Sequence, residues 1–385
     1  MKLSIYLIAF ISALFFLSSC EGAYDFNTDN LSTHIELNSD IAIPIIDASI
    51  SLEEILPKGD ETESFLIIDN EGFISLNYKF ELTAVSIEDL LKDEPLSGSS
   101  LPYVTYQISP QIIYLGLEKL LKQGEIVFAN PSATVYIKNY WSVPVQFKFQ
   151  DFYYYDDETS YNKHLFTGSV IDSWIIVNYP LINGNFETTE IALDNTTSNI
   201  DEVISNLPHH LSFGATFETI PGDAYDVPPH TMDSIKMDLS IPLDLRMQNI
   251  VMQDTIEFSL GDSDTTLIES LILGIEMNNG FPISINTQFY FVDDEYVVLD
   301  SLFTNGLKID AGLVDINGKV NQNTETTTIS ETNDTRIKNI LKSTNIIFKI
   351  ILNTTDANLG QNVKLYSNYE VGIKMGARFK LNPSL

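Results

Sequence analysis

Two acidic triplets are the first residues of this chain whose type and spacing could do chemistry. Asp156-Asp157-Glu158 and Asp293-Asp294-Glu295 each place three carboxylates side by side. Ca²⁺ takes six to eight oxygen ligands, so such a triplet could contribute to a calcium site. Neither triplet has the Asp-x-Asp-x-Asp-Gly spacing of a calcium loop, and each lies between two β-rich runs, where the chain must reverse. We therefore predict solvated hairpin turns at Asp156, Asp157, Asp293 and Asp294, and no metal site.

A run of aromatic residues precedes each triplet. These runs are Phe152-Tyr153-Tyr154-Tyr155 and Phe289-Tyr290-Phe291. Because side chains alternate along a strand, every second ring is expected to face the core. The rings left outside could stack on sugars, contact a partner protein, or cover an edge strand. The candidates for ligand or partner contact are Tyr153, Tyr155 and Tyr290.

The five histidines form no recognisable catalytic or metal-binding motif. They are His34, His164, His209, His210 and His230. The pair His209-His210 could supply a base or a metal ligand, but no carboxylate cluster with zinc-ligand spacing lies beside it. We interpret these residues as loop histidines. A nucleophile elbow, a P-loop, a Gly-x-Gly-x-x-Gly and a His-Glu-x-x-His are all absent from the sequence. We therefore predict no catalytic residue, no enzyme activity and no dissociable cofactor.

The only cysteine follows an N-terminal apolar run. Lys2 precedes apolar residues 3–17, a length typical of a signal-peptide core and too short to span a bilayer comfortably. Leu17-Ser18-Ser19-Cys20 resembles the lipobox of bacterial lipoproteins. That resemblance implies cleavage before Cys20, a diacylglycerol thioether on its sulfur and an acyl chain on the new α-amine. The alternatives are an ordinary secretory signal with an accidental cysteine, or a lone structural thiol.

The lipobox implies that the mature protein is held to a membrane by its lipid. The covalent lipid on Cys20 would then be the only non-protein group, and no intramolecular disulfide could form. Glu21 stands where an inner-membrane retention signal would have Asp, so we expect the outer membrane. The membrane face is open. The acidic composition, rich in Asn, Asp and Ile, resembles that of Bacteroidetes surface lipoproteins and favours the surface.

The charge of the chain narrows the choice of partners. Its 385 residues carry a net charge of −32. Nucleic-acid binding needs clustered Lys and Arg, which this sequence lacks, so we exclude that class of partner. A protein of the cell envelope or a glycan remains as a predicted partner.

The body of the chain contains an internal repeat. Spacings from each acidic triplet to Leu165-Phe166-Thr167 and Leu302-Phe303-Thr304 are identical. Farther on, Glu187-Thr188-Thr189 with Ile191 matches Glu325-Thr326-Thr327 with Ile329 at a constant offset. We interpret residues 126–250 and 256–385 as two homologous units.

Each unit is predicted to be mainly strand with one short helix. Alternating polar and apolar residues indicate strands, and the helices are expected at residues 200–207 and 334–342. Ser198 with Asp201 forms a capping-box pattern for the first helix, and Asn333 caps the second. Many strands without a βαβ alternation indicate a mainly β fold of tandem β-sandwich units.

The order of these features resembles the WHy domain, the water-stress and hypersensitive-response domain of late-embryogenesis-abundant proteins. Asn279-Gly280-Phe281-Pro282 matches its Asn-to-Pro start, whereas Asn139 and Pro144 have two extra residues between them. The resemblance would cover both units, about two thirds of the chain. It implies a surface-associated binding or protective module without catalysis.

The remaining segments complete the predicted domain organisation. Residues 1–19 form the lipoprotein signal peptide, residues 20–37 a lipidated cysteine with a flexible tether, and residues 38–125 an N-terminal β-rich region. That region includes short helices after Ser51, at 86–91 and at 116–123, and a hairpin turn at residues 69–72.

Two functional hypotheses follow, and a third, an envelope hydrolase with a carboxylate pair in a cleft, is left open by the many Asp and Glu residues but indicated by no pattern. The first is a lipid-anchored, non-enzymatic envelope protein that presents tandem β domains for binding or structural assembly at the outer membrane. The second is a carbohydrate-binding surface lipoprotein of a nutrient-uptake system, suggested by the tyrosine run.

Overall fold

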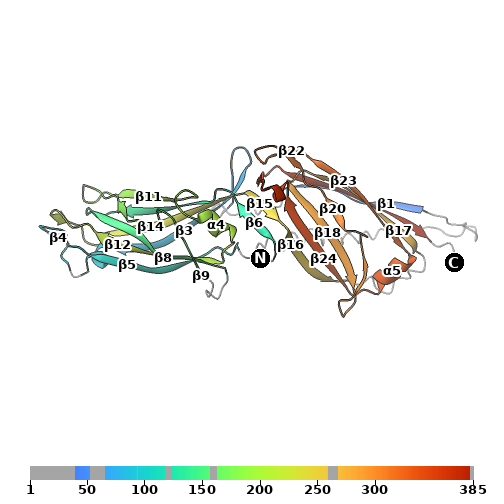
Figure 1. Cartoon of the computed structure of the whole chain (residues 1–385), viewed down its shortest axis with the longest axis horizontal. Coiled ribbons are helices and arrows are strands. Elements are labelled where there is room, and N and C mark those ends of the chain that lie inside the picture. The colour runs from blue at the N-terminus through green and yellow to red at the C-terminus, as the bar shows by residue number, and fades with distance from the viewer. Residues whose placement is uncertain are drawn as a thin grey trace, which may run out of the picture. The chain divides into compact units, whose positions relative to one another are not determined.

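The chain folds into two β-rich units, seen here in a computed structural model that describes residues 40–52, 66–92, 94–117, 123–156, 163–258 and 268–381. One unit, Lys58–Met247, is called here the insert unit. The other is formed by Met1–Pro57 together with Gln248–Leu385 and is called the split unit. The predicted mainly β fold is confirmed (Figure 1).

Two five-stranded antiparallel sheets form the body of the insert unit. The first has the order β10 (Ile175–Val177), β8 (Val145–Tyr155), β12 (His210–Thr219) and β5 (Thr105–Tyr114), and β9 (Lys163–Leu165) also pairs with β8. The second has the order β11 (Glu187–Leu193), β7 (Ser132–Asn139), β14 (Met232–Pro242), β3 (Ile74–Ser86) and β2 (Leu66–Ile68). Smaller elements are α3 (Ile87–Leu91), α4 (Ile200–Ser205), β4 (Ser97–Gly98), β6 (Glu125–Phe128), β13 (Tyr225–Asp226) and β15 (Asp244–Gln248).

The split unit also contains two antiparallel sheets. The first has the order β16 (Ile250–Glu257), β24 (Asn345–Thr354), β18 (Ile283–Val292) and β19 (Val298–Ser301), with β20 (Leu307–Ile309) also on β18. The second has the order β1 (Asp40–Ser51), β26 (Glu370–Leu381), β17 (Ile268–Asn279) and β23 (Thr324–Asn333). Smaller elements are α5 (Asp334–Leu341), β21 (Leu313–Val314), β22 (Val320–Gln322), η3 (Ala357–Leu359) and β25 (Val363–Lys364).

The two units share one strand order. The series β5-β12-β8-β10 in the insert unit corresponds to β16-β24-β18-β20 in the split unit, and β3-β14-β7-β11 corresponds to β1-β26-β17-β23. The helices α4 and α5 follow the matching strands β11 and β23. Two sandwiches of one topology are therefore nested, because the whole insert unit lies in the chain between β1 and β16.

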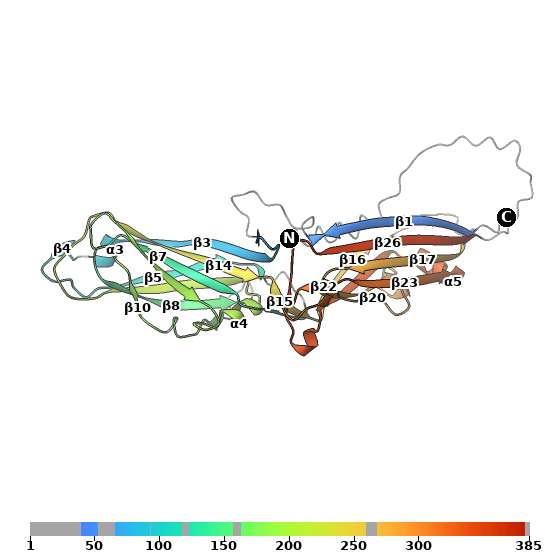
Figure 2. The ribbon, with the colours of Figure 1, turned by 90° about the horizontal axis from the view of Figure 1, so that it is seen from above.

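Residues 38–125 do not form a region of their own. Strand β1 pairs with β26 near the end of the chain, as Figure 2 shows for the blue and red strands. Strands β3 and β5 pair with β14 and β12 of the insert unit. The N-terminal segment thus supplies the first strand of each sandwich. Most of the helices predicted after Ser51 and at 116–123, and the tether, lie outside the described residues.

A buried asparagine occupies the same place in both units. Asn139 ends β7 and Asn279 ends β17, and both side chains are almost fully buried. Each side-chain oxygen accepts a hydrogen bond from the backbone N–H two residues on, in Trp141 and in Phe281. Each side-chain amide donates to a backbone carbonyl after the matching short strand, that of Asn178 and that of Asp310. At each Asn-to-Pro start noted in the sequence, the asparagine side chain therefore fixes the end of its strand by hydrogen-bonding to buried backbone groups.

The repeat alignment at Ile191 and Ile329 is wrong by one residue. Strand pairing places Glu187 opposite Asn139 but Thr324 opposite Asn279. A one-residue shift exchanges the two faces of a strand. Accordingly Ile191 is 4% exposed and faces the core, whereas Ile329 is 70% exposed.

Two helix caps test the local predictions. Asn333 caps α5 as predicted, because its side chain accepts a hydrogen bond from the N–H of Arg336. The predicted capping box at Ser198 is wrong: Asn199 is the N-cap residue of α4, and the Ser198 hydroxyl donates to the carbonyl of Asp194 instead. The Ser198 hydroxyl is thus used in the turn that starts at Asp194, and it does not cap the helix.

Candidate binding face

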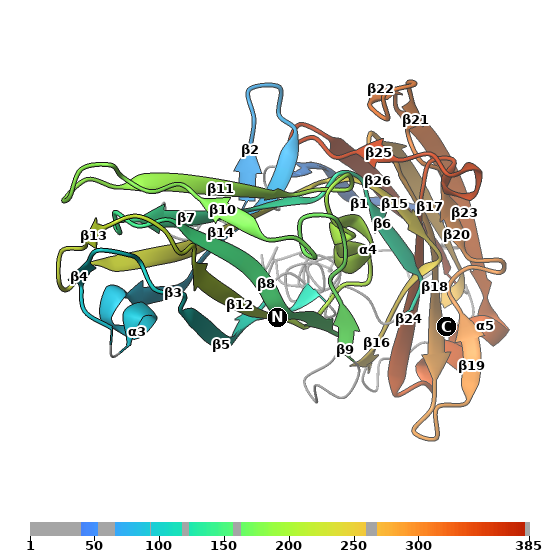
Figure 3. The same cartoon turned by 60° about the vertical axis from the view of Figure 1, so that its left-hand side comes forward.

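The outer face of the first insert-unit sheet carries Tyr153 and Tyr155, two of the three tyrosines predicted to contact a ligand or partner. Residues opposite each other on antiparallel strands lie on one face, so strand pairing defines this surface in rows across β5, β12, β8 and the edge strands (Figure 3). We call it the aromatic face. Its rows contain Tyr114, His210, Tyr155 and Lys163; Ile112, Ser212, Tyr153 and Leu165; Gln107, Thr216 and Lys148; and Thr105, Glu218, Gln146 and Ile176.

A bulge on each side of Gly214 shapes this face. The pairing register shifts on both neighbours of β12 near this glycine, and Asp151 in β8 has a positive φ of 52°. A Cβ atom on Gly214 would lie 2.5 Å from the carbonyl oxygen of Gln150. The strand at the centre of the face therefore needs glycine where the bulged backbone comes close.

At one end of the face, tyrosine and histidine rings pack together. Tyr155 stacks on His210 with ring centroids 4.4 Å apart, and Tyr114 approaches the same imidazole at 5.9 Å. The Nδ1 atoms of His209 and His210 are 2.9 Å apart, so one ring donates and the other accepts. Both histidines are buried, and His210 is the first residue of β12. The interpretation as a loop histidine is therefore wrong for His210, whereas His209 lies in the loop before β12. Both imidazoles contact the Tyr114 ring.

The middle of the face is polar and its flanks are apolar. The Thr216 hydroxyl donates to the side-chain oxygen of Gln150, and Gln146 Nε2 donates to Glu218 Oε2 over 3.0 Å. The most exposed apolar side chains stand along both edges: Ile112, Tyr114, Leu165 and Ile176 are 54–68% exposed. The charged residues of these rows are Lys148, Lys163 and Glu218. Such a surface can stack on flat apolar groups while offering hydroxyls and amides to hydrogen-bonding partners.

The alternation of the aromatic run follows the prediction. Phe152 and Tyr154 are buried, whereas Tyr153 and Tyr155 are half-buried on the outer face. The Phe152 ring stacks on that of Phe166 at 4.0 Å. The Tyr154 phenol accepts a hydrogen bond from Asn206, and burial raises the pKa of this phenol.

Tyr290 lies at the matching place on the split unit, in different surroundings. It pairs with Ile347 on β24 and with Ser301 on β19. The next rows of that face are Gln253, Lys349 and Gln288, and then Val251, Ile351, Asn286 and Lys308. The split unit therefore presents a tyrosine among polar and aliphatic side chains, without the ring cluster of the aromatic face.

The acidic triplet of the split unit forms a hairpin turn between β18 and β19. The N–H of Tyr296 donates to the carbonyl of Asp293, and Asp293 Oδ1 accepts from the N–H groups of Glu295 and Val297. Asp294 is exposed. The predicted turn is confirmed here, and aspartate suits it because its carboxylate satisfies two backbone donors.

In the insert unit the triplet starts at the end of β8. Asp156 Oδ2 lies 2.9 Å from His164 Nε2 across the hairpin, and both side chains are about half exposed. Asp157 lies outside the described residues. Among the residues that the structure describes, no group of three or more His, Cys, Asp and Glu side chains is placed to hold a metal ion. The absence of a metal requirement stays a prediction.

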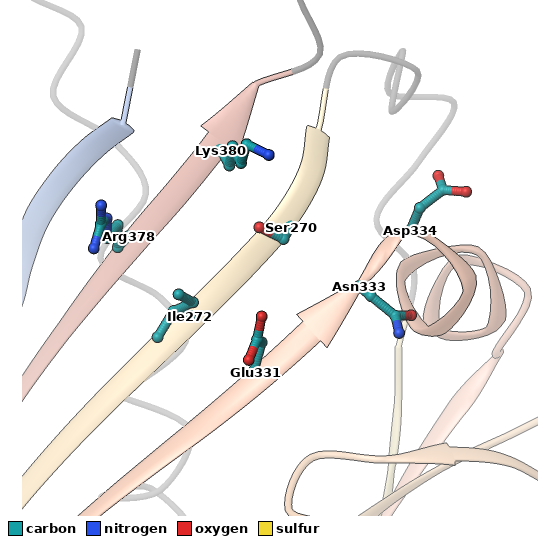
Figure 4. A pocket seen from close by; sticks show the side chains of 7 residues that line it. All are labelled: Ser270, Ile272, Glu331, Asn333, Asp334, Arg378 and Lys380. Carbon is teal, nitrogen blue, oxygen red and sulfur yellow. The ribbon is translucent and has the colours of Figure 1, made fainter. Parts of the chain in front are cut away.

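A pocket of about 510 Å³ lies on the second sheet of the split unit. Figure 4 shows side chains from β17, β26, β23 and the start of α5 around it. Several of these groups have structural roles, since Asn333 caps α5 and Asp334 pairs with Lys338 over 2.7 Å. Its lining residues, of both charge signs, are Ser270, Ile272, Glu331, Asn333, Asp334, Arg378 and Lys380.

One buried carboxyl group stands apart from these surfaces. Asp233 at the start of β14 is fully buried, and its Oδ1 accepts the N–H of Tyr140 over 2.8 Å. Its Oδ2 has no hydrogen-bond partner among the described residues. Burial raises the pKa of this carboxyl group to about 8, although the Tyr140 hydrogen bond opposes the shift. At the matching corner of the split unit, Gly280 donates to the backbone carbonyl of Glu370 instead.

The sequence could not show which strands would complete the aromatic face. Tyr153 and Tyr155 were found because their spacing is local. Ile112, Tyr114, Ser212 and Thr216 come from strands far away in the chain, so only the pairing of β5, β12 and β8 brings them together.

Cys20 lies outside the described residues, and no described helix is long and apolar enough to cross a membrane.

Comparisons with known proteins show weak similarities only. No protein-family profile matches the chain, and no curated protein matches it. A solved structure of a "putative secreted protein" from Parabacteroides distasonis is similar over 89% of this chain and 99% of its own, with a TM-score of 0.45 and 11% identity. A structure of infectious bursal disease virus, strain Gx, covers 80% of this chain and 72% of its own, with a TM-score of 0.20 and 12% identity. Similarities this weak support no functional argument, so the resemblance to the WHy domain stays a prediction.

Proposed function

We propose that the protein is a lipid-anchored, non-enzymatic envelope protein that binds a partner through the aromatic face. The lipobox-like sequence at Cys20 supports an anchor in the outer membrane. The observation that carries the binding role is the aromatic face itself, where exposed apolar flanks surround a polar centre. A group of exposed aromatic and aliphatic side chains gathered on one sheet face is typical of interaction sites. The matching face of the split unit lacks it, so the shared topology does not require it.

The anchor is tested at Cys20. The Cys20→Ser variant should lose all incorporation of a clickable fatty-acid analogue, and it should no longer be found in the washed membrane fraction. The parent chain should incorporate the label and stay with the outer membrane. Label retained on the variant would contradict the lipobox interpretation.

A carbohydrate ligand is the second candidate, and the composition of the aromatic face favours it. Tyrosine rings can stack on the apolar faces of sugars, and the exposed side-chain amide of Gln107 can hydrogen-bond to hydroxyl groups. The test is binding of the Cys20→Ser chain to a glycan array, repeated with Tyr114→Ala and Tyr155→Ala. A hit that both substitutions abolish supports a glycan. Capture of an envelope protein by the same face, without any array hit, supports the first candidate.

A further inference from the structure

The two most exposed aliphatic side chains of the described residues, Ile316 and Leu181, lie in matching loops of the two units. In the insert unit, the loop at residues 178–186 joins β10 to β11, and its Leu181 and Ile182 are 90% and 68% exposed. In the split unit, the connection from β20 to β23 contains the hairpin β21–β22, and Ile316 at its turn is 97% exposed. A single exposed Leu or Ile is ordinary, but here the same topological position exposes such a side chain in both units.

The insert-unit loop belongs to a wider apolar segment. Residues 173–186 contain no charged side chain in a protein with a net charge of −32, and Asp172 and Glu187 bracket them. Trp174, Ile176 and Phe186 from this segment are 40%, 67% and 49% exposed. The segment therefore presents an apolar surface that has no charged residue of its own.

Lysines stand beside the rings of this surface. Lys138 Nζ lies 4.0 Å from the centre of the Phe186 ring, and Lys148 Nζ lies 6.0 Å from that of Trp174. In the split unit, Lys319 Nζ lies 4.4 Å from the Tyr366 ring centre. Aromatic rings and aliphatic tips next to lysine ammonium groups are the combination found where proteins meet lipid headgroups.

We propose that residues 173–186, with Leu181 and Ile182 at the tip, insert into the headgroup region of a lipid surface. A tip that is exposed on nearly all sides is covered fully only by a medium that surrounds it, as lipid does and as a flat protein surface does not. The inference goes beyond the proposed function but rests on its membrane anchor, which would keep the loop near lipid at high effective concentration. Ile316 would make the same contact for the split unit.

The two tryptophans provide a direct test on the chain without lipid. Trp141 is fully buried and Trp174 is 40% exposed, so a change in emission on adding vesicles reports Trp174. We expect vesicles of phosphatidylethanolamine and phosphatidylglycerol to shift the emission of the Cys20→Ser chain to the blue and to protect Trp174 from acrylamide. The double change Leu181→Ser and Ile182→Ser should weaken partitioning by at least about tenfold, because each removed side chain takes away a large apolar transfer energy.

Matched variants separate this contact from general effects. Ile329→Ser, which removes another exposed isoleucine, should partition like its parent, whereas Ile316→Ser should weaken partitioning. Unchanged Trp174 emission with vesicles, or equal partitioning of the double variant, would overturn the proposal. A shift seen with a soluble envelope protein but not with vesicles would also overturn it and assign the loop to protein contact. Because the vesicle test uses unlipidated chains, its failure is distinct from a failure of the Cys20 labelling test.

Discussion

The insert unit and the split unit have the same strand order but fill their cores differently. The largest fully buried side chains all belong to the insert unit: Trp141, Phe147, Phe152, Phe166, Phe213, Phe217, Ile74, Ile87, Leu90, Leu91, Ile137 and Leu193. Helix α4 buries Ile200, Val203 and Ile204, whereas α5 buries no residue. The two units thus share the same hydrogen-bonded strand pairing, although the side chains packed between their sheets differ.

The difference has a cause in strand composition. The core-facing residues of β23 are all hydroxyl-bearing: Thr324, Thr326, Thr328, Ser330 and Thr332. The matching strand β11 places Ile191 and Leu193 in the core. At the other edge of that sheet, Ile43 pairs with buried Ala377 but is itself 48% exposed. The split unit therefore buries less apolar surface per strand, and we expect it to be the less stable unit.

The largest expected effect is separate unfolding of the two units. Both tryptophans belong to the insert unit, so tryptophan fluorescence follows that unit alone, whereas far-UV circular dichroism follows both. In a urea titration of the Cys20→Ser chain, we expect circular dichroism to show a first transition to which fluorescence is blind. Coincident transitions would show that the units unfold as one and would remove this contrast.

A matched pair of phenylalanines sharpens the same contrast. Phe166 and Phe303 occupy equivalent positions. The Phe166 ring stacks on that of buried Phe152, whereas the Phe303 ring centroid lies 6.4 Å from that of partly buried Phe289. Phe166→Ala should cost about 3–5 kcal/mol in the second transition, and Phe303→Ala should cost less in the first. Equal costs would mean that both cores are packed alike.

The second effect depends on pH, through a carboxyl group that the split unit lacks at this corner. The pKa of Asp233 is raised from 3.8 to about 8 by burial, so the folded unit keeps a proton that the unfolded chain loses. Its stabilising contribution is complete below about pH 4 and is lost by about pH 8. Across this window the free energy of unfolding should fall by about 1.4 kcal/mol per pH unit from this group.

The Asp233→Asn variant isolates that contribution. The difference in unfolding free energy between variant and parent should move in favour of the variant as pH rises from about 4 to about 8, and then stay level. Asp238→Asn, on the outward side of the same strand, serves as the control. A difference that is independent of pH would mean that Asp233 ionises in the folded protein as it does in water.

A third effect tests the strand register that separates the two units. Ile191→Thr places a hydroxyl in the insert core and should destabilise that unit by about 1–2 kcal/mol. Ile329→Thr changes an exposed side chain and should stay within about 0.5 kcal/mol. Chemical denaturation of both variants gives the two values. A larger loss for Ile329→Thr would restore the alignment that the sequence offset indicates.

This register shows where sequence reasoning succeeded and where it stopped. The repeat, the strands, the short helix predicted at 86–91 and the cap at Asn333 depend on neighbours in the sequence, and the structure contains them. The nesting of the units depends on β1 reaching β26, a pairing that no local pattern encodes. One trace of it is present in the sequence, because Ser51-Leu52-Glu53-Glu54 repeats the pattern of Ser86-Ile87-Glu88-Asp89. The N–H of Leu52 donates to Tyr369 just as that of Ile87 donates to Thr231.

For the candidate site too, features set by neighbours in the sequence could be predicted, and features set by long-range strand pairing could not. Alternation within β8 was enough to place Tyr153 and Tyr155 outside. The burial of His209 and His210 could not be predicted, because it arises from Tyr114 and Tyr155 on the two neighbouring strands. The Asp233 site was missed altogether, since a single aspartate in an alternating strand gives no signal of where its carboxyl group is buried.

The smallest expected effect compares the two hairpins that start with acidic residues. Asp293 accepts hydrogen bonds from two backbone N–H groups of its own turn, so Asp293→Ala should cost about 1 kcal/mol. Among the described residues, Asp156 pairs with the half-exposed imidazole of His164, and Asp156→Ala should cost about 0.5 kcal/mol or less. In a buffer in which the His164 imidazole is protonated, the Asp156 value should also shrink as salt is added, because exposed ion pairs are screened, whereas the Asp293 value should not change. Adding micromolar Ca²⁺ should leave both parent transitions where chelator leaves them, since turn hydrogen bonds already occupy Asp293. A calcium-dependent rise of either transition that Asp293→Ala removes would instead make this hairpin a metal site, and the two units would then differ in ligand as well as in packing.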